Sequence, residues 1–157
     1  MLSKESIEKI EYELTKYPVD KRQAAVMSAL RIVQTERGWL SKQSIAEVAE
    51  YLRIPEIAAL EVATFYNMYD LEPVGKYKLT ICTNISCMLR DSDAIVNHLQ
   101  AKLGVGFNEV TPDGKFCLKE GECMGACGGA PLMTVNNHTM HERLTLESVD
   151  AILERLK

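Results

Sequence analysis

The chain has 157 residues, enough for one domain or for a domain with a helical extension. Its formal net charge is −4, so no basic excess points to nucleic acid or to an anionic membrane surface. No apolar run approaches the roughly 20 residues of a membrane span, and the first residues resemble neither a signal peptide nor a transit segment. Five cysteines without a secretion signal favour metal ligands or redox groups over a disulfide scaffold.

Four helices are predicted in the first 70 residues. The first carries apolar residues three or four positions apart and stops before Pro18. These residues are Ile7, Ile10, Leu14 and Tyr17. Asp20 and Gln23 resemble a capping box that opens a second helix, and Gly38 is expected to end that helix.

The third and fourth predicted helices have the spacing of a helix-turn-helix motif. Ser41 is expected to cap the third, and Pro55 to begin the fourth, which runs to about Tyr66. We reject DNA binding because residues 55–75 contain no lysine or arginine to face phosphates. We interpret the segment as a docking surface, with ordinary core packing as the alternative for each aromatic or methionine. The candidate anchors are Phe65, Tyr66, Met68 and Tyr69.

From residue 76 the pattern predicts strands as well as helices. Alternating apolar residues at 77, 79 and 81 predict a half-buried strand that leads into Cys82. A helix is expected from about Ser92 to Gly104, then a turn at 112–114 and a short strand at 116–118. Strands at 132–135 and 139–142, joined by a turn at residues 136–137, precede a last helix capped by Thr145. This β-α-β-β-β-α order predicts an α+β chain: a helical bundle in 1–74 and a thioredoxin-like sandwich in 75–157.

Four of the five cysteines form two pairs. The first pair is Cys82 and Cys87, in a C-x4-C spacing, and the second pair is Cys123 and Cys127, in a C-x3-C spacing. Zinc knuckles and thioredoxin redox sites favour two intervening residues, whereas a [2Fe–2S] cluster is a wider object that takes two thiolates on each iron. The spacing therefore favours a [2Fe–2S] cluster, with a structural zinc site as the alternative.

Glycines surround the second pair. They allow the chain to approach the sulfurs closely and to aim backbone N–H groups at them, although a role in shaping a turn is the alternative. These glycines are Gly121, Gly125, Gly128 and Gly129.

The fifth cysteine and the histidines fit a metal site less well. Cys117 has no partner at either spacing, so we expect it in the core, with a ligand role as the alternative. His98 is expected on a solvated helix face. His138 and His141 flank a predicted strand on opposite faces. A Rieske-type centre needs two histidines in place of two cysteines, and it is a weak hypothesis because four well-placed cysteines are already present.

Several motifs together resemble a known family. Cys-Thr-x3-Cys at 82–87 and Cys-Met-Gly-Ala-Cys-Gly-Gly-Ala-Pro at 123–131 resemble the thioredoxin-like [2Fe–2S] subunits of respiratory NADH:quinone oxidoreductase, complex I. The segments 29–34, 37–39 and 62–66 resemble signatures of the family's helical region, so the likeness covers nearly the whole chain. Met124 stands where leucine is common, and Asp91 stands near a position where glycine is frequent.

The resemblance implies an electron carrier without catalytic residues of its own. It implies that the two cysteine pairs bind one [2Fe–2S] cluster and that a larger partner subunit binds FMN and oxidises NADH. Other peripheral-arm subunits are implied partners, and nucleic acid and direct membrane insertion are not expected. The expected location is the bacterial cytoplasm, peripheral to the inner membrane through the complex. The equivalent subunit of an NAD-dependent formate dehydrogenase or a bidirectional hydrogenase is the alternative.

Overall fold

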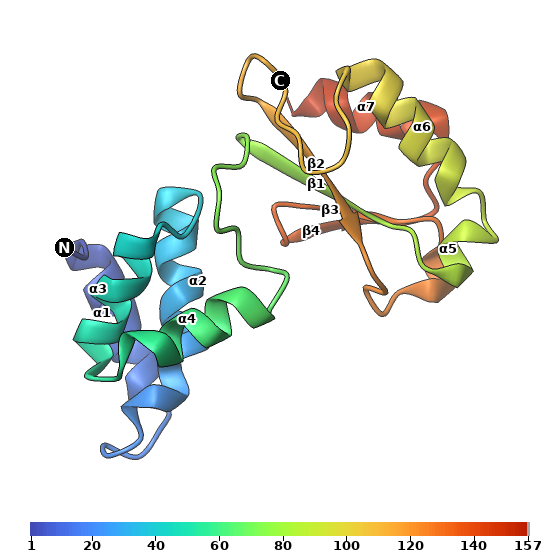
Figure 1. Ribbon diagram of the computed structural model, residues 1–157. Helices are drawn as coiled ribbons and strands as arrows, with labels where there is room; N and C mark the ends of the chain where they lie inside the picture. The colour runs from blue at the N-terminus through green and yellow to red at the C-terminus, as the bar shows by residue number, and fades with distance from the viewer. Residues whose placement is uncertain (157) are drawn as a thin grey trace. The chain divides into compact units, whose positions relative to one another are not determined.

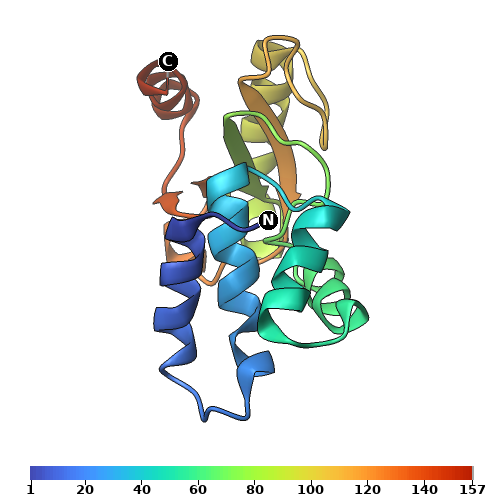
Figure 2. The same ribbon diagram turned by 90° about the vertical axis from the view of Figure 1, so that its left-hand side faces the viewer.

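The computed structural model describes residues 1–156, which form two compact units that divide between Pro73 and Val74. The first unit is helical, and Figure 2 shows α1 and α2 running antiparallel beside each other. Its elements are α1 (Lys4–Leu14), the 3₁₀ turn η1 (Arg22–Ala25), α2 (Val26–Arg37), α3 (Lys42–Leu52) and α4 (Glu56–Phe65).

The helices of the first unit share one apolar core. Ile10 from α1, Leu30 from α2 and Ile45 from α3 are buried in it, as the 3–4-residue spacing predicts. Each such side chain contributes about 1.5–3 kcal/mol through removal from water. Ser41 caps α3 by accepting a hydrogen bond from the N–H of Ser44, and Gly38, at φ +85°, ends α2; both predictions are confirmed.

The predicted starts and ends of three helices need correction. The prediction of a capping box at Asp20 is wrong. The 3₁₀ turn η1 precedes α2, and the N-cap residues of η1 and of α2 make no side-chain capping hydrogen bond. The Asp20 carboxylate pairs instead with the neighbouring Lys21, 2.9 Å away. Helix α1 ends at Leu14, so Tyr17 lies beyond it, and Pro55 is the N-cap of α4 rather than its first residue.

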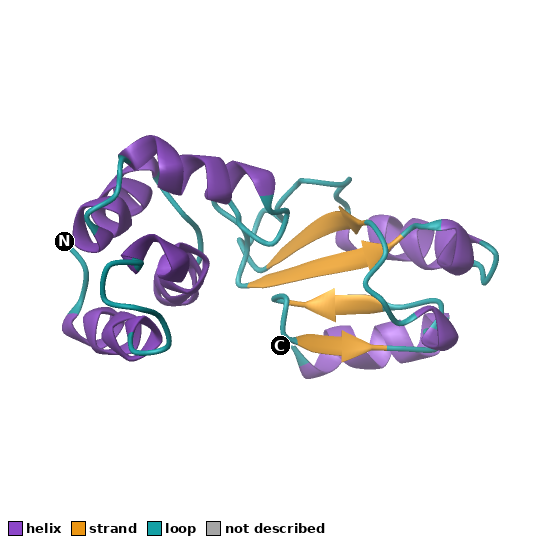
Figure 3. Ribbon diagram, turned by 90° about the horizontal axis from the view of Figure 1, so that it is seen from below, coloured by secondary structure: helices purple, strands orange, loops and turns teal. Residues whose placement is uncertain are grey.

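The second unit is a sheet with helices, which confirms the α+β fold class. Its elements are β1 (Tyr77–Cys82), α5 (Ile85–Met88), α6 (Ser92–Leu103), β2 (Phe116–Gly121), η2 (Cys127–Gly129), β3 (Met133–Val135), β4 (Thr139–His141) and α7 (Leu146–Arg155). The strand order is β2-β1-β3-β4. Figure 3 shows β1 and β2 parallel to each other, with β3 antiparallel to β1 and β4 antiparallel to β3.

One face of this sheet packs against α6 and α7, which lie side by side (Figure 1). Leu79 and Ile81 of β1 are fully buried there with Leu99 of α6 and Val149 of α7. Thr145 forms a capping box with Ser148 at the start of α7, which confirms its predicted role.

The turns of the second unit rely on residues that tolerate left-handed backbone. Asn136 and Asn137 both have positive φ in the tight turn between β3 and β4. Asp91, at the position where the resembling family often has glycine, adopts φ +64° before α6. Aspartate is one of the few side chains that enter this region at modest cost, so the departure from glycine is accommodated. The Ala130–Pro131 peptide bond is cis.

Candidate iron-sulfur centre

The parallel pairing of β1 and β2 places both cysteine pairs at one edge of the sheet. The register runs from Tyr77 opposite Phe116 to Cys82 opposite Gly121, so both strands end together. The first pair lies at the end of β1 and in α5, and the second pair lies in the loop after β2. Met124, between the cysteines of the second pair, packs against the buried first pair. The structure therefore places both predicted cysteine pairs at the same end of the sheet.

Backbone hydrogen bonds hold the first pair in place. Cys82 donates its N–H to the carbonyl of Leu132, 3.1 Å away, and Thr83 donates to the carbonyl of Gly121, 3.0 Å away. Asn84 accepts a hydrogen bond on its carbonyl from the N–H of Cys87 at 2.9 Å, which closes the single turn of α5. The first pair is thus tied to the sheet on both sides.

Side chains connect the loop of the first pair to β2 and the residues after it. The Thr83 hydroxyl donates to Glu120 at 2.9 Å, and the Asn84 amide donates to Glu122 at 3.1 Å. Thr83 and Asn84 thus connect the loop that carries the first pair to the chain that leads into the second pair.

Three of the four predicted glycines meet a steric or conformational demand, and a Cβ at one of them, Gly129, would overlap the Glu142 side chain. A Cβ at Gly121 would lie 2.5 Å from Cε of Met124, 2.8 Å from Cγ2 of Thr80 and 3.2 Å from the carbonyl oxygen of Ile81, so a side chain there would force these neighbours to move. Gly125 has φ +77°, and its N–H donates to the sulfur of Cys123 at 3.4 Å. Such N–H groups stabilise negative charge on a metal-bound sulfur.

The two pairs differ strongly in burial. Cys82 and Cys87 are 2% and 1% exposed, whereas Cys123 and Cys127 are exposed. Burial, together with the neighbouring Cys82, raises the pKa of the Cys87 thiol to about 11. With this pKa the free thiol keeps its proton near neutral pH, and a bound metal cation would favour the thiolate.

The donor set fits a two-iron cluster. The sulfurs of Cys123 and Cys127 lie 3.7 Å apart. Two thiolates that share a tetrahedral metal at about 2.3 Å lie about 3.8 Å apart, so this pair is spaced to hold one iron. Cys82 and Cys87 also interact through their side chains and supply two further thiols, which matches two thiolates for each of two irons. Among residues 1–156, no three Cys, His, Asp or Glu converge on one ion position.

Cys117 lies outside this arrangement. It is 1% exposed in β2, four residues before the strand end at Gly121, which corresponds to roughly 13 Å along an extended strand. Its predicted burial is confirmed.

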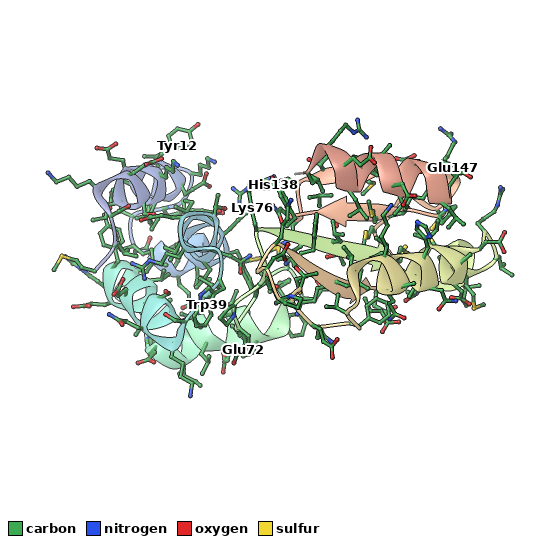
Figure 4. The ribbon with its side chains drawn as sticks, turned by 90° about the horizontal axis from the view of Figure 1, so that it is seen from above. Tyr12, Trp39, Glu72, Lys76, His138 and Glu147 are labelled. Carbon is green, nitrogen blue, oxygen red and sulfur yellow. The ribbon has the colours of Figure 1, made fainter. Side chains whose placement is uncertain are left out.

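The histidines take structural or surface positions. His98 is partly exposed on its helix, and its Nε2 lies 2.6 Å from Asp150, a contact that joins α6 to α7. His138 lies at the turn between β3 and β4 (Figure 4). His141 lies in β4, where burial and then Arg155 lower its pKa.

The candidate docking residues of the first unit separate into two kinds. Phe65 and Tyr66 are 79% and 39% exposed and contact each other edge-to-face at the end of α4. Tyr69 is buried and donates its hydroxyl to the carbonyl of Met27, and Met68 packs against the core, so both belong to the core rather than to a surface. Burial raises the pKa of Tyr69 to about 12.

Sequence reasoning missed helix α5 and the apolar side chains around it. Ile85, Met88 and Leu89 are exposed beside Cys87. The signal was present, because Asn84 is a common cap and apolar residues follow it at i+1, i+4 and i+5. They form exposed apolar surface next to Cys87.

The sequence profile of the thioredoxin-like [2Fe-2S] ferredoxin family matches residues 10–157. The chain belongs to this family. It is 41% identical to a subunit of the NADH-quinone oxidoreductase of Rhizobium meliloti, over 96% of this chain and 88% of that one. It is 42% identical to the corresponding subunit from Rickettsia bellii (92% and 86%) and 38% identical to that from Thermus thermophilus (94% and 82%).

The fold has a solved counterpart in a longer chain. A chain of the air-oxidised NAD+-reducing [NiFe]-hydrogenase superposes with a TM-score of 0.69 at 23% identity, over 81% of this chain and 22% of that one. At this identity the likeness shows the fold alone, here as one part of a longer chain.

Proposed function

We propose that this chain is the [2Fe–2S] electron-carrier subunit of an NADH-quinone oxidoreductase. The observation that carries the proposal is an identity of about 40%, over almost the whole chain, to proteins named as subunits of that oxidoreductase. The four cysteines that gather at the end of the sheet supply the ligand set. We assign them as Cys82, Cys87, Cys123 and Cys127.

A [2Fe–2S] group supplies exchange of one electron at a time. Cys82 and Cys87 would hold the group from the packed interior, away from water. Cys123 and Cys127 would hold it from the surface, where a partner can approach. The Gly125 N–H directed at Cys123 favours the added negative charge of the reduced state. No side chain of this chain is assigned a catalytic role.

NADH oxidation and FMN binding belong, in this proposal, to a larger partner subunit. A hydride carries two electrons and the cluster takes one, so the chain exchanges single electrons with the partner's flavin. The first unit docks within the complex, and its exposed Phe65 and Tyr66 supply the kind of aromatic anchors that interfaces favour. Other peripheral-arm subunits complete the contacts.

The proposed location is the cytoplasmic side of the inner membrane, reached through the complex. Within residues 1–156, none of the helices combines the length and the apolar character that crossing a membrane requires.

Isolation of the complex tests the assignment. The tagged chain is expressed at native level, purified without oxygen, and its partners are identified by mass spectrometry. We expect an FMN-binding subunit together with quinone oxidoreductase subunits, and EPR of the purified complex should show a [2Fe–2S] signal after addition of NADH. Recovery of hydrogenase or formate dehydrogenase subunits instead would establish the alternative.

A matched pair of variants tests the docking unit. Phe65→Ala should lower recovery of the partner by tenfold or more, as expected for loss of an aromatic anchor worth about 1.4 kcal/mol or more. Tyr12→Ala is the control, because Tyr12 is also exposed and projects outward from α1 in the same unit (Figure 4). Equal recovery with both variants would show that Phe65 is not an anchor.

A further inference from the structure

The second cysteine pair combines two properties that the other cysteines lack together. Its sulfurs lie 3.7 Å apart, and both cysteines are exposed. The first pair and Cys117 are buried, so an oxidant in solution does not reach them without opening of the fold. Oxidation of the cluster-free chain is therefore directed to Cys123 and Cys127.

The loop that carries the second pair can close a bond between its sulfurs. A disulfide requires about 2.05 Å between sulfurs, so the two atoms must approach by about 1.7 Å. Only three residues separate the cysteines, and the entropy cost of closing so short a loop is small. Gly125 lies at the centre, in left-handed backbone with open space beside its Cα, and leaves the loop free to adjust.

We propose that Cys123 and Cys127 form a thiol–disulfide switch that controls loading of the cluster. In the cluster-free chain, a low-molecular-weight disulfide such as glutathione disulfide converts the pair to an intramolecular disulfide. Iron requires thiolates, so the oxidised chain does not accept the cluster until a thiol reductant restores the pair. The role in loading rests on the proposed function, whereas the disulfide itself rests on the geometry of the pair.

The reaction proceeds by two exchanges. One cysteine thiolate of the pair attacks a sulfur of glutathione disulfide, which forms a mixed disulfide and releases one glutathione. The second cysteine attacks the protein sulfur of that mixed disulfide and releases the second glutathione. The two protein thiols lose two electrons and two protons, and glutathione disulfide takes them up as two glutathione thiols.

The first experiment locates the bond without any cluster. The full-length chain, produced under iron limitation and purified with a chelator, is incubated anaerobically with glutathione disulfide, alkylated with iodoacetamide and mapped by mass spectrometry. We expect a Cys123–Cys127 cross-link, with the other three cysteines alkylated only after unfolding. Separate glutathione adducts without a cross-link, or a disulfide that includes the first pair, would overturn the proposal.

Two variants sharpen this result. Cys127→Ser should trap a glutathione adduct on Cys123, because the second exchange has no attacking thiol. Cys117→Ser should leave the cross-link unchanged, and its loss in this variant would show that Cys117 takes part.

The second experiment measures loading. Reduced and cross-linked chains receive ferrous iron and sulfide under argon, and bound iron is counted after gel filtration. We expect the cross-linked chain to bind less than a tenth of the iron of the reduced chain, with full recovery after dithiothreitol. Equal loading would refute the switch even if the cross-link forms. A reduced chain that binds no iron and sulfide would refute the proposed function together with the role in loading, while leaving the cross-link established.

Discussion

The two cysteine pairs occupy opposite kinds of protein environment. The first pair is anchored in the sheet and one turn of helix, and it is buried. The second pair lies in a glycine-containing loop and is exposed. The first pair thus provides a rigid, dry half of the site, and the second provides an accessible half. A cluster held between them would be fixed by the fold on one side and accessible for electron exchange with a partner on the other.

The largest expected difference between the buried and the exposed pair is the change in stability when one cysteine of each is replaced by serine. Cys87→Ser and Cys123→Ser should both abolish the native cluster, measured as iron and acid-labile sulfide per chain. In the cluster-free chain, Cys87→Ser should also lower the free energy of unfolding in urea by about 1–3 kcal/mol, because it buries a hydroxyl in apolar surroundings. Cys123→Ser should change it by less than about 0.5 kcal/mol.

Cys117→Ser is the control for ligation, since Cys117 is equally buried but lies away from the site. This variant should keep the EPR signal of the cluster. Loss of the signal would show that the ligand set is wrongly assigned.

The glycines test how tightly the rigid half is packed. Gly121→Ala should lower the free energy of unfolding by about 1–3 kcal/mol, because its Cβ would overlap Thr80 and approach the Ile81 carbonyl. Gly128→Ala is the matched control, with open space beside its Cα. Equal unfolding midpoints for the two variants would contradict the close approach of the strands at Gly121.

A smaller effect is expected from the link between α6 and α7 that supports the sheet. Lys102 and then His98 hold the pKa of the Asp150 carboxyl below its ordinary value. Folding lowers this pKa, so the stabilisation is present above the ordinary aspartate pKa and is lost as pH falls through the lowered value.

Asp150→Asn removes that carboxylate and should flatten the decline in stability below about pH 4. Urea unfolding between pH 6 and 3 measures the decline. An unchanged slope in the variant would show that the link does not contribute.

Local sequence signals predicted the helix starts and ends that depend on a single capping residue or glycine. Ser41 and Thr145 cap their helices as expected, and Gly38 and Gly104 end theirs. Asp20 failed as a cap because the core draws the chain into a 3₁₀ turn before α2, a tertiary effect that a capping motif does not encode.

The candidate site was predicted from cysteine spacing, but its division into two environments was not. Spacing indicates which sulfurs can share a metal, whereas burial of the first pair depends on strand register and on packing against Leu132, far along the chain. Helix α5 was missed because its four residues are too few to establish a helical period on their own, and the cap at Asn84 with the apolar residues after it was not interpreted as a helix start.

Iron and sulfide content tests the central claim most directly. The full-length chain purified without oxygen should contain about two irons and two acid-labile sulfides, with the visible absorption of a ferric–sulfide cluster. A colourless chain with one zinc and no sulfide would contradict the assignment of the two cysteine pairs to a [2Fe–2S] cluster.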